Sequence, residues 1–581
     1  MSPAAQLKWR LTVAVFAAAI GSWAATAIDT RPLDGDELKT PAASRSVKIK
    51  WDGMNGRFDV ENKTDVELNT LAVGYLEQHI NQSGWAFLNI TTFPHGGRYL
   101  DYQQAYAAGL AEGYLTKDLI DMQWRNVYLD YCKDNMDYCS KLNSFLHENL
   151  KYMLEMVKLY SFTDPYWHQV GLVLVQLAGI ESGYEQLPYY VYTGDNLTPN
   201  ISLLTTRPHI MQLNLHGDLV DLERKFGKKQ QNAPGAAAAC SALVALTKDN
   251  ADLLVGHTTW SNYNTMLRIH KKFILQYHKT FDSEQVIPGN VSVFSSYPGR
   301  LISGDDFYLL STKLLVTETS LENNNKSLYV HTTPRGTVPS WVRNLVANRL
   351  ASTPAEWAQI YARNNSGTYN NQWMIVDYKK FRSHQEIPNG TFHVLEQMPG
   401  VIRHGDMSWF LKKFGYWASY NTAYFPEIFN MSGQWELVRK YGDWFTYDKT
   451  PRALMFKRDH HNATSVEGLR MLLRYNNYKH DPLSRCKCTP PYSAENAIAG
   501  RSDLNPANGT YPFAALGHRP HGATDVKVIN STMINDFAML IQSGPTYEDQ
   551  PAFRWSDTDF KQVVRHEGHP DLFKFKPIFK K

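Results

Sequence analysis

The sequence has little net charge, few cysteines and only one long apolar run. Among its 581 residues, 60 basic side chains face 56 acidic ones, which gives a formal net charge of +4. A small charge without clusters indicates neither nucleic acid nor an anionic membrane surface as a partner. Internal repeats are missing, and the only low-complexity tract is a short alanine run.

Several catalytic signatures are also missing. The sequence contains no Gly-x-Ser-x-Gly elbow of a serine lipase. It has no His-Glu-x-x-His zinc helix and no glycine-rich phosphate loop. His460 and His461 are adjacent, so they are poorly placed to bind one metal together. We therefore expect neither a metal nor a cofactor.

The one apolar run lies at the N-terminus. Lys8 and Arg10 precede apolar residues 11–20, and the small residues Ala25-Thr26-Ala27 follow. This order is typical of a signal peptide with an Ala-x-Ala cleavage site, and the run is too short for a membrane anchor of about 20 residues. We predict a signal peptide over residues 1–27, a secreted protein and no stable insertion into a membrane.

Asn-x-Ser/Thr triplets support passage through the secretory pathway, where such sites are glycosylated on accessible loops. The candidate asparagines are Asn62, Asn81, Asn89, Asn196, Asn200, Asn290, Asn325, Asn364, Asn389, Asn430, Asn462, Asn508 and Asn530. We expect several to stay unmodified, because a triplet must also be exposed.

The 5 cysteines are an odd number for an oxidising compartment. Cys132 lies close to Cys139, and Cys486 lies close to Cys488, so each couple can close a local disulfide, although the second loop is tight. Cys240 is then left over. A leftover thiol in a secreted protein is either an intermolecular link or a reactive group.

The predicted secondary structure changes from helices to strands at Cys240. Apolar residues at helical spacing predict helices from Gln104 to about Tyr160 and over residues 168–180. A Pro-Gly turn and small residues predict an exposed linker over residues 228–239. Beyond it, alternating apolar residues predict strands, which together with the helices give an α+β class. The predicted strands cover residues 241–246, 252–260, 266–275, 291–296, 307–319 and 373–378.

The first two strands predict a hairpin that brings a histidine to Cys240. A turn centred near Asp249 places residues 257–259 opposite Cys240, within a residue or two. Opposed Cβ atoms lie about 4.5 to 5.5 Å apart, so His257 can approach the sulfur. A lone buried cysteine is more often a small core residue. A cut before Cys240 would instead give it an α-amino group with a pKa near 7.7 to 8.0, which can act as a general base.

Sequence blocks around and beyond Cys240 resemble the phospholipase B-like family. The most specific is Gly256-His-Thr-Thr-Trp260, which follows Cys240-Ser-Ala-Leu-Val-Ala-Leu246. Further matching blocks cover residues 303–308, 369–374, 415–421, 441–444, 474–477, 501–505 and 544–547. The resemblance covers nearly the whole mature chain. It implies the N-terminal-nucleophile hydrolase fold, a four-layer αββα sandwich of antiparallel sheets, here with a helix-rich N-terminal segment.

The same resemblance implies cleavage between Ala239 and Cys240, so that chains 28–239 and 240–581 form one catalytic unit. It also implies a lysosomal destination as an alternative to secretion. Ala239 departs from the small polar residue that is common before such a cut. The roles implied are the nucleophile for Cys240, substrate-pocket residues for His257, Trp260 and Thr319, an oxyanion-stabilising amide for Asn421 and a pocket arginine for Arg452.

Each of these residues also has a structural interpretation. His257 can be an ordinary strand histidine and Trp260 a core aromatic, while Asn421 can cap a turn and Arg452 can hold a structural carboxylate. We assign His257 to tuning the thiolate or the amine, because the amine already serves as the base. Thr317 is an alternative to Thr319.

Three functions stay open from the sequence. The first is a hydrolase that removes acyl chains from glycerophospholipids, and the second is an amidase with the same mechanism. The third is a secreted glycoprotein that binds lipid or another partner without turnover. The oligomeric state is not predicted.

Overall fold

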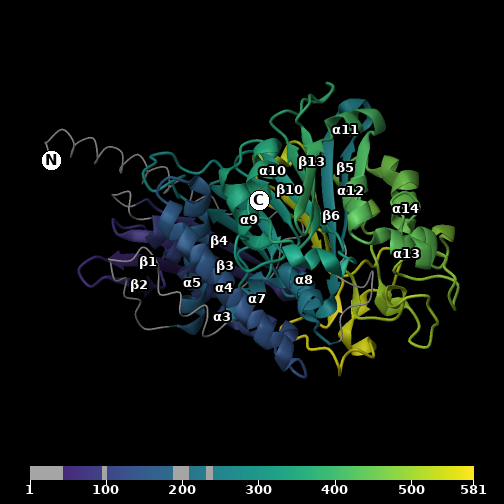
Figure 1. Ribbon diagram of the computed structural model, residues 1–581, viewed down its shortest axis with the longest axis horizontal. Coiled ribbons are helices and arrows are strands. Elements are labelled where there is room, and N and C mark those ends of the chain that lie inside the picture. The colour runs from purple at the N-terminus through teal and green to yellow at the C-terminus, as the bar shows by residue number, and fades with distance from the viewer. Residues whose placement is uncertain (1–42, 95–100, 187–208, 230–239) are drawn as a thin grey trace.

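Two sheets lie face to face between outer layers of helices in the computed structural model, which describes residues 43–94, 101–186, 209–229 and 240–581 (Figure 1). The signal peptide, Ala239 and most of the predicted linker lie outside these residues. The α+β class and the four-layer sandwich of largely antiparallel sheets are confirmed.

The larger sheet has 11 strands in the order β13-β12-β11-β10-β9-β8-β7-β4-β3-β1-β2. Neighbouring strands run antiparallel except β4 and β7, which pair in parallel and join the N-terminal segment to the rest of the chain. The strands are β1 (Ala43–Asp52), β2 (Arg57–Glu61), β3 (Thr70–His79), β4 (Trp85–Thr92), β7 (Arg268–Ile274), β8 (Val291–Ser296), β9 (Phe307–Leu310), β10 (Leu314–Ser320), β11 (Asn371–Asp377), β12 (Phe392–Met398) and β13 (Val401–Asp406).

The second sheet has 7 strands in the order β14-β5-β6-β16-β17-β20, with β15 also paired to β6. Its strands are β5 (Cys240–Leu246), β6 (Leu253–Asn262), β14 (Tyr416–Ser419), β15 (His521–Ala523), β16 (Asp525–Ile529), β17 (Met539–Ser543) and β20 (Ile578–Lys580). Two short strands, β18 (Phe553–Arg554) and β19 (Leu572–Phe573), pair separately.

Alternation along β5 explains the layers, because successive side chains of a strand point to opposite faces. Ala242 and Val244 join the apolar core between the two sheets. Leu243 and Ala245 point the other way and pack on the outer helices. Cys240 shares the parity of Ala242, so the strand directs its side chain toward the space between the sheets.

Helices of the N-terminal segment and the middle of the chain share one core with the larger sheet. They are α3 (Asp101–Val127), α4 (Met136–Tyr160), α5 (Pro165–Glu185), α7 (His209–Asn214), α8 (His216–Phe226), α9 (Ser340–Leu350) and α10 (Pro354–Ala362). Helices α14 (Pro451–Asp459) and α15 (Val466–Leu473) cover the second sheet. The shorter helices are α2 (Ile80–Ser83), α11 (Ser408–Phe414), α12 (Pro426–Met431) and α13 (Gln434–Tyr441).

Helices α3 and α5 approach each other through glycines on both sides. A methyl group at Gly113 of α3 would come within 2.1 Å of the Ile180 carbonyl oxygen of α5. One at Gly179 of α5 would come within 2.3 Å of the Tyr106 carbonyl oxygen. The two backbones are therefore in direct contact, and only glycine fits at these positions.

Three predicted elements differ from the structure. The helix predicted from Gln104 to Tyr160 is two helices, α3 and α4, separated by a turn that the Cys132–Cys139 disulfide closes. The strand predicted over residues 307–319 is the hairpin of β9 and β10, because Lys313 adopts a left-handed backbone conformation (φ 60°). The N-terminal segment also contributes four strands to the larger sheet, more than its helical texture predicts.

Both predicted cysteine pairs are disulfides, and Cys240 is a free, buried thiol. In the described parts of the chain, no helix is both long enough and apolar enough to cross a membrane. Glycosylation stays a prediction, and the exposed candidates are its best sites: Asn62, Asn81, Asn389, Asn430, Asn462 and Asn508.

Candidate active site at Cys240

Cys240 begins strand β5 beside strand β6. It pairs with Thr259, and Ala242 pairs with His257, as the predicted hairpin requires to within its stated uncertainty. His257 is therefore a diagonal neighbour of Cys240 on the same face of the sheet. The Cys240 side chain is only 5% exposed and borders a cavity of ≈ 110 Å³.

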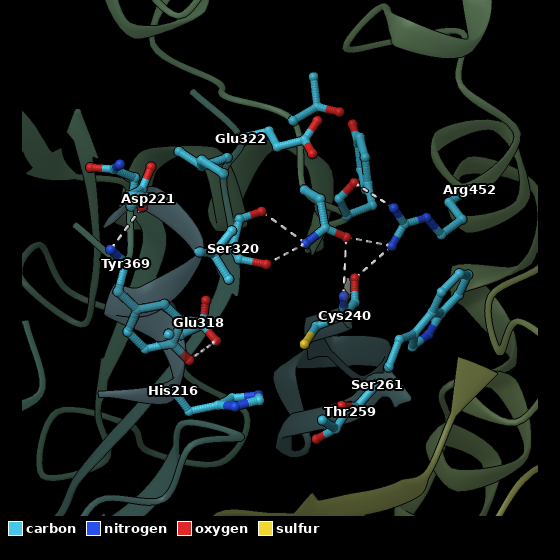
Figure 2. A pocket seen from close by; sticks show the side chains of 18 of the residues that line it. His216, Asp221, Cys240, Thr259, Ser261, Glu318, Ser320, Glu322, Tyr369 and Arg452 are labelled. Atoms are coloured by element: carbon cyan, nitrogen blue, oxygen red, sulfur yellow. Dashed lines mark hydrogen bonds between the residues drawn. The ribbon is translucent and has the colours of Figure 1, made fainter. Parts of the chain in front are cut away.

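Two side chains hold the backbone of Cys240 (Figure 2). Its N–H donates to Asn421 Oδ1 at 3.1 Å, and its carbonyl oxygen accepts from Arg452 Nη1 at 2.5 Å. Arg452 Nη1 also lies 2.8 Å from Asn421 Oδ1. Both backbone groups of Cys240 are fixed, while its sulfur points away from Arg452.

Asn421 follows strand β14 in a left-handed conformation (φ 67°), which asparagine tolerates better than most residues. Its Nδ2 donates to the Ser320 carbonyl oxygen at 2.8 Å, which orients Oδ1 toward Cys240. Its backbone N–H donates to Thr319 Oγ1 at 3.3 Å, and that hydroxyl also bonds Ser419. Thr319 thus lies behind the cavity wall and positions Asn421. The oxyanion role of Asn421 stays a prediction, because its Nδ2 is engaged with Ser320 here.

Arg452 lies in the first turn of helix α14 and contacts three parts of the site. Besides Cys240, its Nη2 donates to the Tyr420 carbonyl oxygen at 2.9 Å, and its guanidinium stacks over Trp260 at 4.7 Å from the ring centroid. Burial lowers the pKa of Arg452 to about 10, so the side chain stays charged at physiological pH. A charged guanidinium held this way polarises the carbonyl group of Cys240.

The sulfur faces a second group of residues. The Cys240 sulfur, a ring nitrogen of His257 and a carboxylate oxygen of Glu318 all lie within 4.8 Å of one another. Burial and the charge of Glu318 raise the pKa of the Cys240 thiol well above its usual value. Burial lowers the pKa of His257 well below its usual value, so the imidazole is neutral. The thiol is therefore protonated, and neither His257 nor Glu318 carries a positive charge that would stabilise its thiolate.

Glu318 belongs to an acidic cluster that the sequence did not predict. The Tyr369 hydroxyl donates to Asp306 and, at 3.3 Å, to Glu318 Oε1. Burial is the main cause that raises the pKa of Asp306 to about 7 and the pKa of Glu318 well above its usual value. Asp306 and Tyr369 do lie in sequence blocks that resemble the family, and this resemblance could have marked them as candidates for the site. Nothing in the sequence indicates that these blocks meet beside Cys240.

A buried network of charged side chains holds strand β6, which pairs with the strand of Cys240. Lys527 Nζ donates to Thr259 Oγ1 at 2.7 Å and to Asp525 at 2.8 Å. Arg268 Nη2 donates to the same carboxylate at 2.6 Å and also pairs with Asp305. Two cations and two carboxylates balance one another, and they tie strands β6, β7 and β16 together next to Cys240.

The cavity wall combines aromatic and polar residues. Cys240, Trp260, Asn421 and Arg452 line it, whereas His257 and Thr319 lie behind it. The structure therefore gathers every described residue that the sequence analysis proposed for the site. Additional lining residues include His216, Asp221, Arg224, Tyr297, Glu318, Glu322, Tyr369, Tyr420, Trp444, Phe445 and Glu495.

The sequence matches known proteins over most of its length. The Phospholipase B family pattern matches residues 72–579. The phospholipase B-like 2 protein of Mus musculus is 44% identical over 550 residues, which cover 93% of this chain and 89% of the mouse protein. The phospholipase B-like 2 protein of Homo sapiens is 43% identical over 551 residues, 93% of this chain and 90% of its own. Phospholipase B-like protein B of Dictyostelium discoideum is 36% identical over 503 residues, which cover 85% of this chain and 82% of the Dictyostelium protein.

Proposed function

Because the chain belongs to the phospholipase B-like family, we propose that it is an N-terminal-nucleophile hydrolase that removes acyl chains from glycerophospholipids. A cut between Ala239 and Cys240 would activate it in the secretory pathway or the lysosome. The observation that carries the proposal is the backbone nitrogen of Cys240, which Asn421 holds at 3.1 Å beside the residue's own sulfur. After the cut, this nitrogen is the α-amine of the same residue.

The maturation step begins with attack of the Cys240 sulfur on the carbonyl carbon of Ala239. The peptide C–N bond breaks as the C–S bond forms, and the nitrogen of Cys240 takes the proton that the thiol loses. Water then hydrolyses the thioester, which leaves a carboxylate on Ala239 and a free thiol and amine on Cys240. The hydrogen bond from Arg452 to the Cys240 carbonyl oxygen keeps the residue in place through these steps.

In the mature enzyme the amine supplies the base that the thiol requires. Burial keeps the thiol protonated, whereas an α-amine has an ordinary pKa near 7.7 to 8.0 and can accept its proton. The thiolate attacks the acyl carbon of the substrate, and the ammonium returns the proton to the departing alcohol oxygen. Water, activated by the amine, hydrolyses the acyl-enzyme and releases the fatty acid.

The test compares fragments and turnover of the wild-type chain with those of Cys240→Ala. We expect wild-type protein to yield a fragment that begins at Cys240, identified by N-terminal sequencing and intact mass. Cys240→Ala should stay uncut and inactive, while a Cys139→Ala variant of the disulfide pair should still be cut. Full turnover by an uncut chain, or by Cys240→Ala, would contradict the proposal.

The substrate class is tested with matched ester and amide compounds. We expect the cut wild-type chain to release fatty acid from phosphatidylcholine faster than from an N-acyl amide of equal chain length. Preference for the amide would assign the chain to the amidases with the same mechanism. A cut chain that turns over neither compound but binds phosphatidylcholine vesicles would instead be a lipid-binding glycoprotein.

A further inference from the structure

Three metal-binding side chains converge at the nucleophile. The Cys240 sulfur, a ring nitrogen of His257 and a carboxylate oxygen of Glu318 lie within 4.8 Å of one another, and all three residues are buried. No other group of three or more such side chains meets this criterion within the described ranges. Zn²⁺ binds thiolate sulfur at about 2.3 Å and imidazole nitrogen or carboxylate oxygen at about 2.0 to 2.2 Å. Small side-chain rotations would bring the three donors to these distances.

His257 provides an independent reason to expect a ligand here. Its side chain is 0% exposed, and neither ring nitrogen makes a hydrogen bond of ordinary length and angle, although the Glu318 backbone is a weak partner that raises the pKa of the ring. Buried polar atoms are normally well satisfied, so a weakly bonded imidazole beside a thiol calls for a physical explanation. A bound cation would satisfy one of these nitrogens.

From these contacts we infer that the mature chain binds one thiophilic divalent metal ion such as Zn²⁺ at Cys240, His257 and Glu318, and that this ion reversibly blocks the nucleophile. The donor set of sulfur, imidazole and a single carboxylate favours Zn²⁺ over Mg²⁺ or Ca²⁺, which prefer oxygen ligands alone. A thiolate and a carboxylate together balance the two charges of the ion. The ion inhibits because it occupies the sulfur that would attack the substrate.

The fourth donor rests on the proposed function. Once the bond before Cys240 is cut, the α-amine and the sulfur of one residue can bind the same ion and close a five-membered ring. Before the cut the same nitrogen is an amide that donates its hydrogen to Asn421, and it has no lone pair to offer. We therefore expect the cut chain to bind Zn²⁺ at least tenfold more tightly than the uncut chain. Binding releases the thiol proton to solvent, together with any proton that the Glu318 carboxyl carries.

Co²⁺ is the probe, because a sulfur ligand gives it a charge-transfer band in the near ultraviolet. Metal-free cut protein is titrated with Co²⁺ and then with Zn²⁺ at neutral pH. We expect one Co²⁺ per chain with a sulfur-to-cobalt band, displacement of Co²⁺ by Zn²⁺, and loss of any turnover with the same stoichiometry. Glu318→Gln should weaken Co²⁺ binding at least tenfold.

His404→Ala is the matched control. His404 is exposed and lies 3.3 Å from His393, so this variant removes a metal-binding side chain outside the proposed site. This variant should bind Co²⁺ as the wild type does. Unfolding temperatures of all variants exclude misfolding as the cause of a loss.

The three side-chain donors are present whether or not the chain is cut. Absence of the sulfur-to-cobalt band in both forms would overturn the inference even for an active enzyme. Binding that Glu318→Gln leaves unchanged, or that His404→Ala abolishes, would overturn it as well. One bound Co²⁺ with the expected band in a chain without turnover would refute only the proposed function.

Discussion

Arg452 contacts the backbone of Cys240 and leaves its sulfur free. Its two nitrogens hold the carbonyl oxygens of Cys240 and Tyr420, and the flat guanidinium covers Trp260. A lysine keeps the charge but cannot make both hydrogen bonds in one plane. The role of this side chain is therefore geometric as well as electrostatic.

We predict that Arg452→Lys lowers kcat on acyl substrate by about a hundredfold with a smaller change in KM, because small misplacements of a nucleophile cost that much. Steady-state kinetics and the rate of cleavage before Cys240 measure the effect. Arg458→Lys is the control on the same helix, since Arg458 is partly exposed and pairs with Asp459 and Asp481. Equal losses in the two variants would contradict a specific role for Arg452.

Asp306 makes the folding stability of the protein depend on pH. Its pKa rises from 3.8 to about 7 through burial. Well below pH 3.8 the carboxyl is protonated in both the folded and the unfolded chain. As the pH rises toward 7, the unfolded chain ionises first, so the free energy of unfolding falls, by up to about 4 kcal/mol.

We predict that Asp306→Asn removes this part of the pH dependence. Asparagine keeps the hydrogen-bonding shape and tolerates the left-handed conformation of residue 306 (φ 53°). The unfolding temperature of the variant relative to the wild type should rise by a few degrees between pH 4.5 and 7.5, measured by differential scanning calorimetry. A difference that does not change with pH would show that Asp306 does not titrate in this range.

Single residues of the site were predictable to different extents. Cys240 follows from an odd cysteine count and a small-residue linker, and His257 follows from the length of one hairpin. Asn421 and Arg452 came only from the resemblance, since each lies far from Cys240 in the sequence. Glu318 was missed because its partners Asp306 and Tyr369 come from separate loops that only the tertiary fold brings together.

At the scale of elements, the contact between α3 and α5 depends on the absence of side chains. We predict that Gly113→Ala destabilises the protein by about 1 to 3 kcal/mol, because the new methyl group would overlap the Ile180 carbonyl oxygen. Gly405→Ala is the matched control, because a methyl group at that strand position meets no atom within 4 Å. Thermal unfolding should separate the two variants. Similar melting temperatures would contradict the tight contact.

Strands beyond Cys240 were predicted better than those before it. Strands β5, β6 and β8 are short segments bounded by turn residues, and their bounds agree with the prediction to within two residues. The first half of strand β4 (Trp85–Thr92) is buried on both faces, so residues 85–88 form a short apolar run without alternation. Such a run does not distinguish a strand from a buried helix. The paired glycines of α3 and α5 were visible in the sequence, but only the structure identifies them as a contact.

At the scale of the molecule, the proposed cut separates two chains that share one sheet and one core. Strand β4 lies before the cut, and its residues 85–91 pair with the whole of β7, which lies after it. Each disulfide lies within one of the two chains, Cys132–Cys139 before the cut and Cys486–Cys488 after it. Noncovalent contacts alone would therefore hold the mature protein together.

We predict that the two chains elute together on size-exclusion chromatography at neutral pH. They should separate on a denaturing gel without any reducing agent. An unprocessed Cys240→Ala chain serves as the reference, because it should give a single peak on the column and a single band on the gel. Dissociation of the fragments on the column, or a denaturing gel that needs reductant to resolve them, would contradict the prediction.

The parallel pairing of β4 with β7 would also make unfolding after the proposed cut irreversible. An intact precursor that unfolds can search for its native partner strand within one molecule, whereas the two pieces of a nicked protein diffuse apart and must meet again by collision. At low protein concentration, reassembly would lose to aggregation and proteolysis. The working lifetime of the enzyme would then be set by how slowly it first opens rather than by its equilibrium stability.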